Sequence, residues 1–126
     1  MSALREKQSR FAVLLAHLIV WIDTQGKGWA VTLSDGGVTQ VRKVQLADGT
    51  RVRATDREHM AGSLHYQRLA QDLNLFVNGQ LITSGADPAW RAIGAKWKSM
   101  APDAAWGGDF ASGDANHVSL RHEGKA

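Results

Sequence analysis

The chain has 126 residues, the usual size of one domain, and its 44% hydrophobic and 21% charged residues are typical of a folded protein rather than a disordered one. The net charge of +3, from 15 Lys and Arg against 12 Asp and Glu, suits an anionic partner but is too small to indicate nucleic-acid binding. The chain has no cysteine, which excludes disulfides, thiolate zinc sites, iron–sulfur clusters and cysteine nucleophiles.

Apolar residues at helical spacing predict a first helix over residues 9–23, which the glycine-containing segment 25–28 ends. The apolar run 11–22 inside this helix is shorter than the about 20 residues that cross a bilayer, and His17 interrupts it, so we expect no membrane span. Basic residues precede the run as in a secretory signal, but no small-residue cleavage site follows it. We therefore interpret this segment as an amphipathic helix packed into the core, with an export signal or a weak membrane anchor as the alternative.

The middle of the chain favours short strands and turns. The type of segment 38–46 stays open, because it mixes polar and apolar residues without a clear period. The other expected elements are a strand at 29–33, a turn at 34–37, an extended segment at 51–55, a loop at 60–63, a strand at 69–76, a tight turn at Asn78-Gly79 and a return strand at 80–83.

The last third of the chain predicts a second helix over residues 88–100, because Pro88 stands at its start and apolar residues then recur on one face. A loop at 106–108, a last strand formed by Phe110 and 117–120, and a frayed polar tail complete the prediction. Helices and strands alternate irregularly, so the expected class is α+β, with a small antiparallel sheet flanked by helices.

Two histidines and two aspartates form a candidate metal centre. Asp72 follows His65 by seven residues, and His117, which follows Asp114 by three, stands 45 residues beyond Asp72. A catalytic zinc takes three protein ligands and leaves the fourth position to water, which two His and one carboxylate can satisfy without a thiolate. A second carboxylate that does not bind the metal could then accept a proton from that water. Spacing alone still favours ordinary structural histidines.

The remaining histidines have simpler interpretations. His17 lies within the first predicted helix and fits a packed or half-exposed side chain. His59 fits a solvated loop, although it could line a cleft. His122 lies near the end of the chain and fits the surface, with a supporting contact to a metal ligand as the alternative.

Two segments resemble the signatures of a known enzyme family. Ser63–Asp72 resembles the Ser-x-His-x-x-Gly-x-Ala-x-Asp signature of the D-alanyl-D-alanine carboxypeptidase (VanY-like) family of zinc peptidases, which includes the L-alanyl-D-glutamate endopeptidases that bacteriophages use as endolysins. The segment 106–117 resembles the second signature of the phage branch, in which Trp-Gly-Gly precedes Asp/Glu-x-x-His. The resemblance covers roughly residues 63–120, with Arg68 in place of the signature glycine and Val118 where the family often has Phe.

The resemblance implies a role for each matched residue. His65, Asp72 and His117 are expected to bind one Zn²⁺ ion, although such a ligand set also suits other divalent metals. Asp114 occupies the position of the family's catalytic acid and base, and Ser63 is expected to support the site or touch the substrate.

The resemblance also implies an upstream arginine that stabilises the oxyanion of the reaction. We choose Arg42, which lies 21 residues before Ser63, and Arg53 and Arg57 remain alternatives. Trp106, beside two glycines, is the best candidate for a substrate-facing ring.

As a whole, the resemblance implies a single zinc peptidase domain over residues 1–126, with a hedgehog/D-Ala-D-Ala-peptidase-like fold and no separate wall-binding module. Its expected partner is the stem peptide of peptidoglycan, cut at the L-alanyl-D-glutamate bond or alternatively at D-alanyl-D-alanine. A non-catalytic zinc-binding recognition module on the same fold is a further alternative. We expect a monomer that accumulates in the host cytoplasm and reaches the cell wall at lysis.

Overall fold

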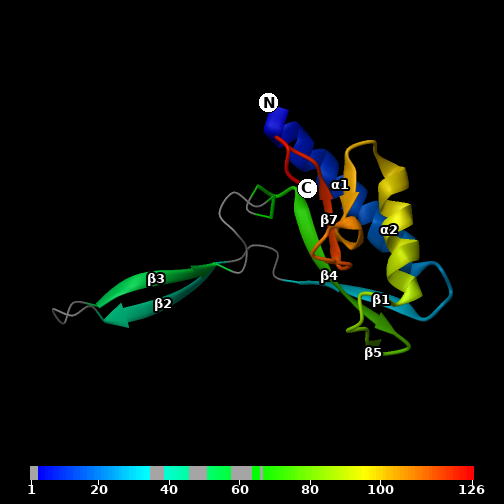
Figure 1. Ribbon diagram of the computed structural model, residues 1–126, viewed down its shortest axis with the longest axis horizontal. Helices are drawn as coiled ribbons and strands as arrows, with labels where there is room; N and C mark the ends of the chain where they lie inside the picture. Colours follow the sequence, from blue (N-terminus) through cyan, green and yellow to red (C-terminus); the bar gives the residue numbers. More distant parts are fainter. Residues whose placement is uncertain (1–2, 35–38, 46–50, 58–63, 66) are drawn as a thin grey trace.

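A computed structural model describes residues 3–34, 39–45, 51–57, 64–65 and 67–126 of the chain, with the backbone alone for 39–45 and 51–57 (Figure 1). The described residues form an α+β structure, as the sequence predicts. In chain order the elements are α1 (Ala3–Asp23), β1 (Trp29–Leu33), β2 (Thr39–Gln45), β3 (Arg51–Arg57), β4 (Ala70–Val77), β5 (Gln80–Leu81), α2 (Pro88–Met100), β6 (Ala104–Trp106), the 3-10 helix η1 (Gly107–Asp109) and β7 (His117–Leu120).

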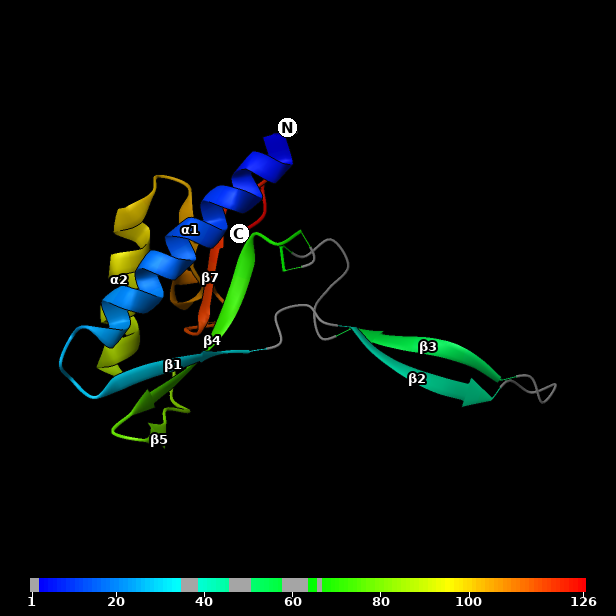
Figure 2. The same ribbon diagram turned by 180° about the vertical axis from the view of Figure 1, so that it is seen from behind.

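The strands form one antiparallel sheet and one separate hairpin. The sheet has the order β1-β4-β7-β6, and β5 pairs with the end of β4. The hairpin consists of β2 and β3, which pair from Thr39 opposite Arg57 to Gln45 opposite Arg51. The hairpin lies apart from the sheet and from both helices in the two opposite views (Figures 1 and 2). Within the sheet, β4 and β7 are the central pair, because β1 flanks β4 and β6 flanks β7.

The core lies where α1 and α2 pack against this sheet and against each other. Phe11 of α1 meets the edge of the Trp97 ring of α2, with ring centroids 5.7 Å apart. The indole nitrogen of Trp97 donates a hydrogen bond of 3.0 Å to the carbonyl of Ser119 in β7. The same core cluster includes fully buried side chains of the helices and the two central strands: Leu18, Ile22, Leu73, Leu75, Ile93, Val118 and Leu120. This burial makes β4 and β7 a rigid platform.

The strongest local signals predict their elements well. The second helix spans residues 88–100 as expected, and the Asp87 carboxylate caps it by accepting a hydrogen bond from the amide of Ala89. Asn78 and Gly79 both have positive φ angles, 50° and 79°, as the expected tight hairpin turn requires. The first helix ends at Asp23 as predicted, although it already begins at Ala3. The open segment 38–46 contains strand β2, and the return strand is only Gln80–Leu81.

Three expectations near the end of the chain are wrong. Trp106 ends strand β6 rather than belonging to a loop. All three residues of β6 are buried, so the sequence lacks the alternation of polar and apolar residues that marks a half-exposed strand. Phe110 follows η1 and is not part of a strand. The tail is not frayed throughout, because His122 and Lys125 exchange two backbone hydrogen bonds of 2.9 Å. Residues 35–37 of the predicted turn and the predicted loop 60–63 lie outside the described residues.

None of the helices in the described part of the chain has both the length and the apolar character needed to cross a membrane. The first helix packs into the core as expected, because α1 buries Phe11, Leu18 and Ile22 while polar residues such as Arg10 and His17 are exposed. Val13 and Val20 are also exposed, so its outer face is not entirely polar.

Candidate metal centre

The pairing of β4 with β7 brings two of the predicted ligands together. Asp72 lies directly opposite His117 in this antiparallel register, although 45 residues separate them in the sequence. His65 belongs to the turn that leads into β4, and this turn is closed by a hydrogen bond of 2.9 Å from the amide of Leu69 to the carbonyl of Leu64. Two paired strands and one adjoining turn therefore supply the three side chains.

Arg68 occupies the signature-glycine position in this turn, and its φ angle is +59°. This left-handed conformation suits glycine better than a residue with a side chain, which explains why the resembling signature has glycine there. The side chain of Arg68 is exposed, so it lies at the surface of this turn.

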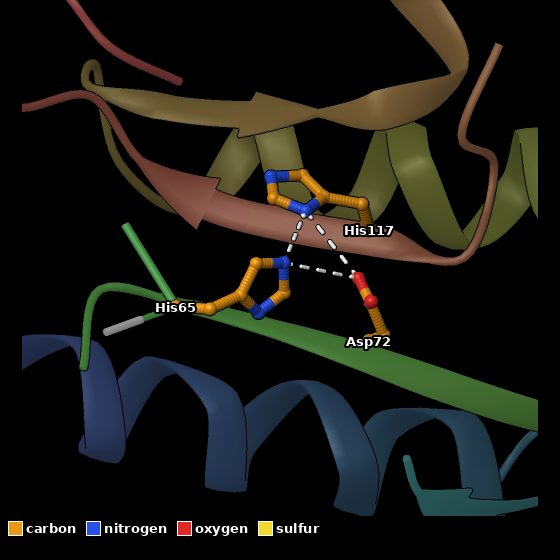
Figure 3. Close-up of side chains that lie close together, drawn as sticks. All are labelled: His65, Asp72 and His117. Atoms are coloured by element: carbon orange, nitrogen blue, oxygen red, sulfur yellow. Dashed lines mark hydrogen bonds and ion pairs between the residues drawn. The ribbon is translucent and has the colours of Figure 1, made fainter. Parts of the chain in front are cut away.

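The three side chains point at one another (Figure 3). Nε2 of His65 lies 3.1 Å from Nδ1 of His117, and each of these nitrogens lies 3.4 Å from Oδ1 of Asp72. A tetrahedral ion with metal–ligand bonds of about 2.1 Å holds its ligand atoms about 3.4 Å apart, so the observed triangle fits such an ion. Both imidazoles are buried, with 5% of His65 and 8% of His117 exposed. His65, Asp72 and His117 are thus close enough to bind a metal ion, as predicted.

Asp114 lies on the wall of the same pocket without belonging to the ligand triangle. The pocket has a volume of about 150 Å³, and its described lining consists of His65, Asp72, Asp114, Asn116 and His117. The hydroxyl of Ser112 donates a hydrogen bond of 3.1 Å to Oδ2 of Asp114. The backbone carbonyl of Asp114 accepts a hydrogen bond of 3.0 Å from the amide of His117. Asp114 therefore contributes to the wall of the pocket that holds the three candidate ligands, and its side chain lies outside their group.

Trp106 occupies a place in the core, not the substrate-facing position that the sequence suggested. Its side chain is almost fully buried, and its indole nitrogen donates a hydrogen bond of 2.6 Å to the carbonyl of Ala115. A Cβ atom added at either Gly94 or Gly108 would lie 2.2 Å from the ring, so these two glycines allow the ring to fit. Trp106 therefore holds the loop that carries Asp114 and His117.

Gly107 fixes the same loop from its other side. Its carbonyl accepts a hydrogen bond of 2.9 Å from the amide of Asp114. A Cβ atom at Gly107 would lie 2.0 Å from the carbonyl oxygen of Asp114, so the close approach of the two backbones requires glycine. The Trp-Gly-Gly segment thus has a structural explanation: it supports the Asp-x-x-His segment beside it.

Two further predicted residues are not placed at the site. Arg42 lies in β2, opposite Ala54, and its side chain is outside the described part of the structure, as are those of the alternatives Arg53 and Arg57. Ser63 lies outside the described residues. The roles of these residues stay predictions.

Asn116 is a site residue to which the sequence assigned no role. It lines the metal pocket, and its carbonyl accepts a hydrogen bond of 2.9 Å from the amide of Leu73 in β4. In the sequence, only its position next to His117 could have indicated that Asn116 belongs to the site. Asn116 also lines a larger cavity of about 370 Å³ beside the pocket, which we call the neighbouring groove.

Comparison with known proteins gives no assignment: no family model matches the chain, and no curated protein matches it. The functional proposal therefore rests on the geometry of the site, which supports a metal centre, and on the sequence resemblance, which suggests the substrate.

Proposed function

We propose that this chain is a zinc-dependent peptidoglycan peptidase of the endolysin type, on a hedgehog/D-Ala-D-Ala-peptidase-like fold, which hydrolyses the L-alanyl-D-glutamate bond of the stem peptide. The observation that carries the proposal is the convergence of His65, Asp72 and His117, with ligand atoms 3.1–3.4 Å apart, in a pocket whose wall also holds Asp114. Two neutral imidazoles and one carboxylate suit Zn²⁺, and together with a bound Zn²⁺ ion they would carry a net charge of about +1.

A Zn²⁺ ion held by this triangle would polarise the scissile carbonyl and lower the pKa of a bound water from about 15.7 toward about 7. Among the described residues that line the pocket, Asp114 is the carboxylate outside the ligand triangle, and its role is to accept the proton of the attacking water and later deliver one to the leaving amine. The Ser112 hydroxyl, which donates to Oδ2 of Asp114, orients this carboxylate.

The burial of the two histidines supports the same conclusion. Because His65 and His117 are almost fully buried, the charge of a bound ion is poorly screened by water on their side of the pocket. The presence of Asp114 favours catalysis over a non-catalytic recognition module, since a protein that only binds zinc has no need of a proton acceptor beside it.

The test is mass spectrometry of purified muropeptides digested by the zinc-loaded protein. We expect products with a new amino terminus at D-glutamate. The variant His117→Ala should lose both zinc and activity, whereas the matched variant His17→Ala, on the exposed face of α1, should keep both.

Each result of this digestion has a clear meaning. Release of D-alanine alone would show that the protein cleaves the D-alanyl-D-alanine bond instead. No cleavage by protein that holds one zinc ion per chain would overturn the proposed peptidase.

A further inference from the structure

The neighbouring groove adjoins the metal pocket and shares Asp114 and Asn116 with it. Its volume of about 370 Å³ is more than twice that of the metal pocket, about 150 Å³. The lining comes from four parts of the fold: strand β4, residues 81–85, helix α2 and the loop before β7. Its described lining residues are Leu73, Asn74, Leu81, Ile82, Thr83, Gly85, Trp90, Gly113, Asp114, Ala115 and Asn116.

The lining of the groove is almost free of charge. Leu81, which is 52% exposed, and the half-buried Ile82 supply apolar surface, and the buried side chains of Leu73, Trp90 and Ala115 lie behind it. Asn74, Thr83 and Asn116 can form hydrogen bonds without carrying charge. Asp114 is the one ionisable residue among the described residues of the lining. The groove therefore suits an uncharged group, whereas an anionic group would be repelled by Asp114.

The position of the groove along β4 relates it to the scissile bond. Asp72 lines the metal pocket, and Asn74, two residues further along the same strand, lines the groove. Two residues of a strand span about 7 Å. An extended peptide covers at most about 3.3–3.6 Å per residue, so one or two substrate residues next to the scissile bond reach the groove.

We propose that the neighbouring groove is the subsite for the acyl side of the scissile bond and that it selects an uncharged acyl group. The inference rests on the proposed peptidase function. For both candidate bonds the amine side carries a free carboxylate, on D-glutamate or on the terminal D-alanine. Asp114 disfavours that carboxylate in the groove, so the substrate lies with its acyl side there.

The same reasoning favours one of the two candidate bonds. The acyl side of the L-alanyl-D-glutamate bond consists of L-alanine and the lactyl group of the sugar, neither of which is ionised. The acyl side of the D-alanyl-D-alanine bond includes an ionised diamino acid within two residues. A groove whose described lining is uncharged apart from Asp114 therefore fits the un-ionised acyl side of L-alanyl-D-glutamate better.

The first test compares two synthetic peptides with the same L-alanyl-D-glutamate bond and the same amine side. One carries an uncharged lactyl cap on L-alanine, and the other carries an acidic succinyl cap. We expect the zinc-loaded protein to cleave the lactyl peptide with a kcat/KM about tenfold higher, because like charges at this range repel.

Thr83, an exposed residue of the lining, offers a charge variant that lies outside the metal triangle. Thr83→Lys should reduce the preference for the lactyl peptide to about threefold or less, because the new cation attracts the succinate. Thr83→Gln, which adds no charge, and Val13→Lys, which adds the same charge on the exposed face of α1, should keep the wild-type ratio.

A second measurement does not depend on cleavage. Addition of N-acetyl-L-alanine amide to ¹⁵N-labelled protein, with and without zinc, should shift the amide signals of Ile82, Thr83, Gly85 and Gly113. The acidic analogue N-succinyl-L-alanine amide should shift them less at the same concentration.

The outcomes separate the two proposals. Equal cleavage of both peptides, unchanged by Thr83→Lys, overturns the subsite and leaves the peptidase intact. If zinc-loaded protein cleaves neither peptide, the peptidase fails, and the amide shifts alone then decide whether the groove binds uncharged acyl groups. Shifts that are absent or larger with the acidic analogue overturn the subsite.

Discussion

Four side chains of the metal pocket divide into two groups that substitutions can separate. His65, Asp72 and His117 form the ligand triangle, whereas Asp114 stands on the wall beside it. Loss of a ligand should therefore remove metal and activity together, and loss of Asp114 should remove activity alone.

The variant Asp114→Asn keeps the size of the side chain and removes its ability to accept a proton. We expect kcat to fall by about 10²–10⁴-fold, the usual contribution of a general base. Zinc affinity, measured by isothermal titration calorimetry, should change little. A zinc affinity that falls together with kcat would instead show that Asp114 belongs to the ligand set.

At the residue scale the sequence predicted the three residues that the structure brings close enough to bind a metal ion, but not all of their surroundings. The spacing of His65, Asp72 and His117 indicated a metal site only weakly, because spacing does not show which strands pair. The resemblance to two peptidase signatures selected the same three residues, and the register of β4 with β7 now places Asp72 opposite His117. The burial of Trp106 could not be predicted, because it depends on Gly94 from another element.

At the scale of elements, the loop between η1 and β7 depends on Trp106. The variant Trp106→Phe leaves the carbonyl of Ala115 without its indole donor, which should lower the free energy of unfolding by about 1–3 kcal/mol. The loop that carries His117 should also loosen, so we expect weaker zinc binding in calorimetry.

Trp97→Phe provides the matched control. It removes a comparable indole hydrogen bond, to Ser119, from the core rather than from the loop. We expect a similar loss of stability with a smaller loss of zinc affinity, because Ser119 lies two residues beyond His117 in β7. Equal zinc affinities in the two variants would contradict a positioning role for Trp106.

A charge pair joins α1 to the turn before β6. Arg10 donates hydrogen bonds of 2.9 Å and 2.5 Å to the two carboxylate oxygens of Asp103. The hydrogen bond from Arg10 is the main cause that holds the pKa of Asp103 below its ordinary value, against a smaller opposing effect of burial. The same contact raises the pKa of Arg10.

This pair predicts a pH dependence of stability. A carboxyl with a lowered folded-state pKa stabilises the protein at pH values above its unfolded pKa of about 3.9, and the contribution is lost as pH falls through the folded value. Asp103→Asn should therefore lower the free energy of unfolding by up to about 1 kcal/mol at pH 7, since the pair is partly exposed. In urea titrations this difference should shrink below about pH 4, and a difference independent of pH would contradict the assignment.

At the scale of the whole molecule, sequence patterns within one element predicted that element, whereas the contacts between distant segments were not predicted. Helical periodicity and the Asn78-Gly79 turn depend on neighbouring residues and gave α2 and the β4–β5 hairpin. The order of the sheet and the fully buried strand β6 depend on contacts between distant segments, which periodicity does not encode.

The ligands come from the turn before β4, from β4 and from β7, so a bound metal links segments that unfolding separates. Zinc that binds only the folded state should stabilise it by about 2.7 kcal/mol at a free concentration of 100 times Kd. For a chain of this size we expect Tm to rise by about 10 °C. Thermal melts with zinc and with EDTA test this, and His117→Ala should show no shift.

The Trp106 ring packs against Gly94 in the middle of α2. Gly94 lines neither the metal pocket nor the neighbouring groove, yet a methyl group there would collide with the ring whose nitrogen holds Ala115. A random screen for inactive clones should therefore recover Gly94→Ala, a change on a helix remote from the chemistry. Zinc titration of that variant should show a weaker affinity than that of the unmodified protein.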